Sequence, residues 1–115
     1  MSTTVFENSK IYQLKESVEY ASGSIVSKIV AKNNAGNITL FAFDKGQNLS
    51  EHTAPFDAFV QVIEGDAKII IDKQEYRLKE GDFIIMPANI PHAVEATEKF
   101  KMLLTMLKAV IEIKI

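Results

Sequence analysis

Two histidines carry the chemistry that this sequence can support. His52 and His92 are the only histidines among 115 residues, and cysteine is absent. An imidazole has a reference pKa near 6.5, so it can exchange a proton close to neutrality, and its neutral form is a common metal ligand. Thiolate sites, cysteine nucleophiles and disulfides are excluded because there is no thiol. His52 and His92 are therefore candidates for catalysis or ligand binding, unless each is a core residue hydrogen-bonded within the fold.

Each histidine lies in a block punctuated by glycine and proline. The first block holds Gly46, His52 and Gly65, and the second holds Gly81, Pro87 and His92. The two blocks, their internal spacing and the distance between them resemble the paired motifs of the cupin family over residues 37–107. The resemblance implies an all-β fold, the double-stranded β-helix or jelly-roll barrel of the cupins.

Several other motif positions depart from the family pattern. Ala54 and Ala58 stand where cupins carry a histidine and a glutamate, and Ala96 stands where they carry an asparagine. In metal-binding cupins such positions hold a divalent transition metal, and the resemblance leaves His52 and His92 as the metal ligands for iron, manganese, nickel, zinc or copper. Two neutral donors are few for such an ion, which usually takes three or four protein ligands. A metal is therefore expected to be optional.

No carboxylate replaces the missing ligands at the expected positions. Asp57 lies one residue before the ligand position, and Glu95 has the opposite parity to His92. Adjacent residues of a strand point to opposite faces, so both carboxylates are expected to face away from the histidines unless a bulge turns them.

The alternation of side chains predicts which residues surround the two imidazoles. Ala58, Val60 and Val62 share one face of a strand, and His92 shares a face with Val94 and Ala96. In the cupins the first of these faces points into the barrel. The predicted ligand pocket is His52, Ala54, Ala58, Val60, Val62, His92, Val94 and Ala96.

Short runs with a period near two predict eight strands, and Gly46, Gly65 and Gly81 are interpreted as turn residues between them. We expect them at residues 25–31, 37–44, 59–63, 66–72, 75–78, 83–86, 92–97 and 101–107. Residues 11–18 are the best candidate for a turn or two of helix. The length suits one domain: an N-terminal extension over residues 1–24, a barrel core over about 25–107 and a C-terminal strand over 108–115.

The C-terminal strand alternates isoleucine with charge. Ile111, Ile113 and Ile115 would share one face. Such a strand either joins the barrel of its own chain or lies at a subunit interface, since an exposed edge of this kind invites pairing. The resemblance to small cupins implies a homodimer.

Composition argues against two classes of partner. The net charge is −2 and Arg77 is the only arginine, whereas a protein that binds nucleic acid needs a basic stripe. No apolar run approaches the ~18 residues of a membrane span, and the N-terminus has no basic and apolar signal sequence. We expect a cytoplasmic protein with neither nucleic acid nor membrane as partner.

Three functions remain open, and the sequence leaves undecided whether the protein is an enzyme. The first is binding of a small-molecule ligand in the barrel, around His52 and His92. The second is metal-dependent catalysis of the dioxygenase or isomerase kind, with water or a non-standard third ligand. The third is a non-catalytic oligomeric scaffold. A barrel fold alone does not choose among them.

Overall fold

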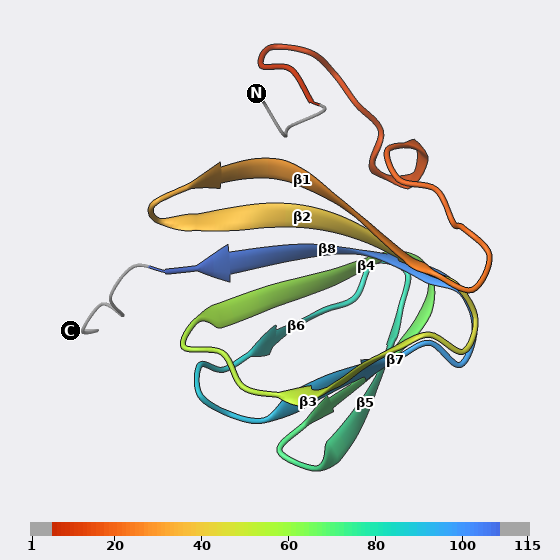
Figure 1. The fold of residues 1–115 in the computed structure, drawn as a ribbon, viewed down its shortest axis with the longest axis vertical. Coiled ribbons are helices and arrows are strands. Elements are labelled where there is room, and N and C mark those ends of the chain that lie inside the picture. Colours follow the sequence, from red (N-terminus) through yellow and green to blue (C-terminus); the bar gives the residue numbers. More distant parts are fainter. Residues whose placement is uncertain (1–5, 109–115) are drawn as a thin grey trace.

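The computed structural model describes residues 6–108, which form a curled antiparallel barrel preceded by an arm (Figure 1). Its strands are β1 (Ile25–Asn33), β2 (Gly36–Phe43), β3 (Asn48–His52), β4 (Asp57–Ile71), β5 (Gln74–Lys79), β6 (Phe83–Met86), β7 (His92–Glu95) and β8 (Phe100–Leu107). A single 3-10 turn, η1 (Leu14–Glu16), lies in the arm. The predicted all-β jelly-roll class is confirmed. No helix among residues 6–108 is both long and apolar enough to cross a membrane.

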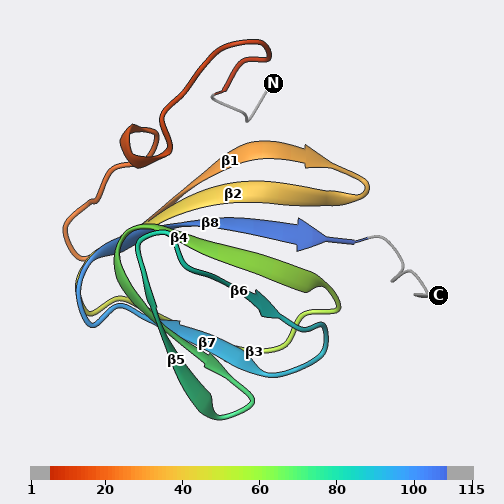
Figure 2. The ribbon, with the colours of Figure 1, turned by 180° about the vertical axis from the view of Figure 1, so that it is seen from behind.

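Strand β4 joins the two sheets of the barrel. Its first half pairs with β8 and β6, and its second half pairs with β5 and β7. The first sheet therefore has the order β1-β2-β8-β4-β6, and the second has the order β5-β4-β7-β3. Figure 2 shows from behind how β4 passes from one sheet into the other. Residues from both halves of β4 consequently face the same interior.

The prediction of separate strands at 59–63 and 66–72 was wrong, because β4 runs without a break from Asp57 to Ile71. Gly65 was read as a turn residue, and its φ is indeed positive at +78°. A register shift between Val62 and Glu64 accompanies it. Glycine and bulge bend the strand sharply without ending its hydrogen-bonded ladder.

Two other elements differ from expectation. Strand β3 was not predicted, because its sequence Asn-Leu-Ser-Glu-His is mostly polar and mostly exposed. Of the turn or two of helix expected within residues 11–18, the structure has the single 3-10 turn η1, which buries none of its own residues. The expected C-terminal strand lies almost entirely outside the described residues, which end at Lys108.

Two apolar clusters lie on opposite faces of the first sheet. The interior cluster includes Phe43, Phe100, Val60 and Ile69, all fully buried. The outer cluster comprises Leu40, Ala42, Ile63 and Val18, and Val18 belongs to the N-terminal arm. The arm thus covers part of the sheet's outer face.

Polar contacts hold this arm in place. The Lys101 ammonium donates to the Lys15 carbonyl oxygen, and the Tyr20 hydroxyl donates to Glu64 at 2.7 Å. The Gly23 N–H donates to Asp44 at 2.7 Å. Because Lys101 and Glu64 also form an ion pair of 3.8 Å, the arm is joined to the barrel by side chains from the first sheet.

Candidate functional site

The two histidines meet at one end of the barrel. They are cross-strand partners in the β3–β7 pair, and their Nε2 atoms lie 3.1 Å apart. The ring centroids are separated by 4.4 Å, with the planes near perpendicular at 68°. His92 is buried, with 5% of its surface exposed, and His52 is exposed. One imidazole therefore belongs to the interior, and the other connects it with solvent.

A β-bulge in β3 brings His52 into this position. Leu49 pairs with Val94 and His52 pairs with His92, so three steps along β3 correspond to two along β7. Without the extra residue, Glu51 would oppose His92. The inserted residue shifts the side-chain alternation by one and turns the imidazole toward His92. Glu51 accepts two contacts from Lys73, at 2.9 and 3.0 Å.

Each imidazole is held through its other nitrogen by a backbone carbonyl. Nδ1 of His52 lies 2.7 Å from the Ser50 oxygen, and Nδ1 of His92 lies 3.2 Å from the Ile90 oxygen. A carbonyl oxygen only accepts hydrogen bonds, so both Nδ1 atoms carry hydrogen. In the neutral rings both Nε2 atoms are then acceptors, and they face each other.

The loops around the histidines are tied together by hydrogen bonds. The Asn89 N–H donates to the Ala54 oxygen at 2.7 Å, and the Ala88 N–H donates to Asp57 at 2.9 Å. Asn89, which replaces the glycine of the family motif, adopts a φ of +65°, a region that asparagine enters more readily than most residues. The loops after β3 and β6 lie at the same end of the barrel (Figure 1).

The carboxylates near the histidines have other partners. Asp57 is engaged by the Ala88 N–H, and Glu95 lies 3.3 Å from the Lys68 ammonium. Among residues 6–108 there is no group of three or more histidine, aspartate or glutamate side chains arranged to hold a metal ion. The described side chains therefore do not complete a metal site, although His52 and His92 are close enough to share one ion, given metal–nitrogen bonds of about 2.0–2.1 Å.

The residues predicted to line a pocket are not all at the histidine end but are distributed along the length of the barrel. His52 and Ala54 lie at the histidine end, and the strand register places Ala58 there, beside Met86 and Met106. Val62 pairs with Met102, and Ala96 is tied through its backbone to Gly46 and Gln47 at the other end. Ala58, Val60, Val62, Val94 and Ala96 are buried members of the interior cluster. Sequence reasoning missed Ile71, the cross-strand partner of His92 on its other side.

Burial makes His92 difficult to protonate. Loss of solvent lowers its pKa below the ordinary 6.5, and the nearby His52 adds to the effect, while the Ile90 carbonyl opposes it. Between pH 6.5 and the lower folded pKa, the unfolded chain binds more protons, so acidification through this range favours unfolding.

We therefore expect the melting temperature to fall as pH drops from 7.5 to 5.5, and the fall to be smaller in His92→Asn. Circular dichroism at fixed protein concentration measures both. An identical pH dependence in the variant and the native chain would contradict the assignment to His92.

The fold agrees with comparison to known proteins. The family model for the cupin domain matches residues 39–107. This chain belongs to the cupin family. A crystal structure of a Streptococcus pyogenes protein of unknown function is 38% identical, with a TM-score of 0.87, over 96% of this cupin and 98% of that chain.

Two further relatives are similar to this cupin. A cupin 2 conserved barrel domain protein from Leptotrichia buccalis is 45% identical with a TM-score of 0.82. The match covers 84% of this chain and 47% of that one. An uncharacterized protein of Aquifex aeolicus is 26% identical over 102 residues, which is 87% of this cupin and 84% of the relative.

Proposed function

We propose that this cupin binds a small protic molecule, such as a phenol or enol, through the His52–His92 pair. The observation that carries the proposal is the contact of 3.1 Å between the two Nε2 atoms while both Nδ1 atoms face carbonyl oxygens. The three contacts need three hydrogens, one on each Nδ1 and one between the two Nε2 atoms. Two neutral imidazoles carry only two.

The missing hydrogen has to come from outside the pair. A proton from solvent would place a positive charge beside His92, which burial opposes. A neutral protic ligand donates its hydrogen to an Nε2 atom without adding net charge. The site therefore favours a ligand that brings a hydrogen-bond donor in an uncharged form.

The surroundings favour a ligand with an apolar body. Ala58 and Met86 are cross-strand partners and Ile71 is the partner of His92, and each of the three belongs to or packs against the interior apolar cluster. His52 is exposed and gives access from solvent. Apolar walls with few convergent polar groups are typical of small-molecule sites.

Nitrogen NMR tests the proposal directly, because the chain contains only two histidines. Protein labelled with ¹⁵N at histidine would be titrated with phenol and acetylacetone, and separately with Zn²⁺, Mn²⁺, Fe²⁺, Ni²⁺ and Cu²⁺. We expect at least one organic probe to shift both Nε2 resonances while both Nδ1 resonances stay in the protonated range. His92→Ala should weaken the same binding at least about 10-fold, which is the order of one lost hydrogen bond.

The matched control is Thr53→Ala, which changes an exposed neighbour of His52 and leaves both rings in place. It should bind the probe as the native chain does. Absence of any Nε2 shift with all organic probes would overturn the proposal, as would equal binding by His92→Ala.

A metal-dependent enzyme is the second candidate, favoured by the closeness of the two Nε2 atoms. The remaining ligands would have to be water or substrate, because the described residues offer no third donor group. Stoichiometric metal in the purified protein, lost in both His52→Ala and His92→Ala, would select this candidate.

A further inference from the structure

The loop between β6 and β7, residues 87–91, carries the carbonyl group that His92 faces. The Ile90 oxygen in this loop lies 3.2 Å from Nδ1 of His92. The corresponding contact of His52 is with the Ser50 oxygen, within β3 and at 2.7 Å. The hydrogen on His92 therefore depends on the position of a loop, whereas that on His52 depends on its own strand.

The two neutral histidines can share their hydrogens in two ways. In the open arrangement both Nδ1 atoms carry hydrogen, and both Nε2 atoms accept a donor from a ligand. In the closed arrangement the hydrogen of His92 is on Nε2 and is donated to Nε2 of His52, 3.1 Å away. The closed arrangement leaves Nδ1 of His92 facing the Ile90 oxygen, acceptor against acceptor, so it is disfavoured while that carbonyl stays in place.

The loop is held near both of its ends. The Asp72 N–H donates to the Pro91 oxygen at 2.8 Å, just before β7. The Ala88 N–H donates to Oδ1 of Asp57 at 2.9 Å, just after β6. The backbone contact with the loop after β3, described above, lies between them. Of these three contacts, the one with Asp57 is made by a side chain, so a substitution can remove it without changing the backbone.

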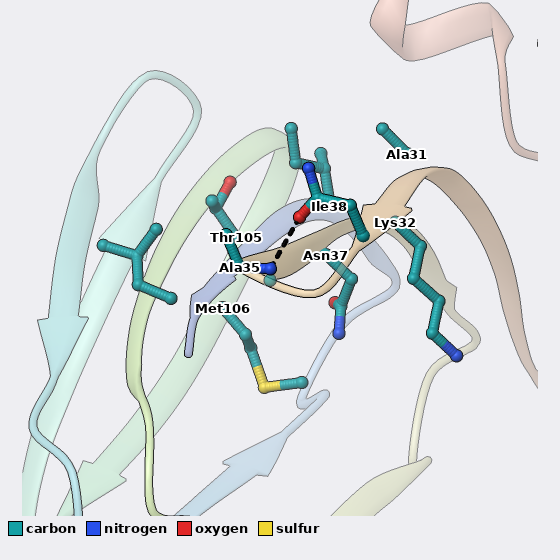
Figure 3. A pocket seen from close by; sticks show the side chains of 10 residues that line it. Ala31, Lys32, Ala35, Asn37, Ile38, Thr105 and Met106 are labelled. Carbon is teal, nitrogen blue, oxygen red and sulfur yellow. Dashed lines mark hydrogen bonds between the residues drawn. The ribbon is translucent and has the colours of Figure 1, made fainter. Parts of the chain in front are cut away.

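Asp57 lies at a paired corner of the first sheet. It begins β4 and pairs with Leu107, the last residue of β8, which pairs in turn with Gly36 at the start of β2. Figure 3 shows the start of β2 and the end of β8 at this corner, with Ala35 and Met106 labelled. The carboxylate therefore has a fixed place from which it can hold the loop.

We propose that Asp57 is a positioning residue: it holds the loop through the Ala88 N–H, and the loop holds the Ile90 carbonyl that keeps the histidine pair open. Asp57 acts through the loop and not as a ligand. Loss of its acceptor loosens the start of the loop. The hydrogen of His92 then exchanges through solvent from Nδ1 to Nε2, which closes the pair to a donor ligand. The effect on hydrogen position is independent of any ligand, whereas the effect on ligand binding rests on the function proposed above.

Histidine ¹⁵N spectra without ligand test the positioning role, at about pH 8 so that an ordinary imidazole is neutral. We expect hydrogen on both Nδ1 atoms in the native chain. In Asp57→Ala we expect the hydrogen of His92 on Nε2. Asp57→Leu should do the same, because it keeps the branched shape of the side chain but accepts no hydrogen bond. Circular dichroism checks that each variant is folded, and Asp57→Leu decides the outcome where Asp57→Ala does not fold.

Two matched controls separate the loop contact from other effects. Asp57→Asn keeps an acceptor oxygen at the same position and should give the native spectrum. Asp44→Ala removes a carboxylate that accepts the Gly23 N–H at 2.7 Å, at the other end of the barrel, and should also give the native spectrum. With phenol or acetylacetone, the dissociation constant should rise at least about 10-fold in Asp57→Ala and Asp57→Leu and stay within about 2-fold in both controls.

Hydrogen that remains on Nδ1 of His92 in folded Asp57→Ala and Asp57→Leu overturns the positioning role. An Asp57→Asn spectrum like that of Asp57→Ala also overturns it, because the charge and not the hydrogen bond would then be responsible. If neither probe binds the native chain while the hydrogen of His92 moves as expected in the variants, the proposed function fails and the positioning role is supported.

Discussion

The Phe100→Ala variant is expected to lose about 3–5 kcal/mol of free energy of unfolding. Phe100 is fully buried at the start of β8, and its ring stacks on Phe43 at 4.6 Å. Alanine at this position removes the transfer free energy of the ring and leaves a cavity that the surrounding strands fill only in part. Urea denaturation followed by circular dichroism measures the loss, at one protein concentration because association would contribute to stability.

The graded control is Phe100→Leu, which keeps most of the volume and is expected to cost clearly less than alanine. A cost below about 1 kcal/mol for Phe100→Ala would mean that the stacked pair contributes little to the stability of the interior cluster.

Gly65→Ala is expected to destabilise the protein by at least about 3 kcal/mol, because it adds both backbone strain and a steric clash. Its φ is +78°, and a Cβ atom there would lie 2.5 Å from the Lys99 oxygen and 3.1 Å from the Phe100 Cα. Both contacts are with backbone, which cannot rotate away as a flexible side chain can. The same urea titration measures the cost.

Gly23→Ala separates the cost of backbone strain from the cost of the steric clash. Gly23 has a similar φ of +64°, but an added Cβ would meet nothing within 4 Å. We expect it to cost about 1 kcal/mol, from backbone strain alone. Equal costs for the two variants would show that the close approach of β4 to β8 tolerates a methyl group.

Gly65→Ala should also disturb the histidine pair, although Gly65 lies in the middle of β4 and Ile71 at its end. The bend at Gly65 directs the second half of β4 into the second sheet, where Ile71 pairs with His92. A changed direction at the bend therefore moves the strand against which His92 packs. The ¹⁵N resonances of the two imidazoles report this shift.

Much of the barrel could be predicted from local pattern. Alternation placed Ala58, Val60 and Val62 on one face, and all three belong to the interior cluster. Gly46, Gly65 and Gly81 all adopt positive φ, as their reading as turn residues implied. These features depend on the residue and its immediate neighbours, so they can be predicted from the sequence alone.

The sheet face of Asp57 and Glu95 was also predictable. Both were expected to face away from the histidines by strand parity, and the contacts with the Ala88 N–H and the Lys68 ammonium agree with that. Parity fails only where the register shifts. The β3 bulge is such a place, and the local sequence Asn-Leu-Ser-Glu-His does not predict it.

What the sequence by itself determined is the fold class, because strand periodicity and the spacing of the two cupin-like blocks are local properties of the chain; a chemical role for His52 and His92 stays a prediction. What only the tertiary structure decided is how those residues meet. The bulge aims His52 at His92, two carbonyl groups select the hydrogen on each Nδ1, and the continuous β4 brings Ile71 against His92. Each depends on pairing between segments distant in the chain, which residue spacing does not encode.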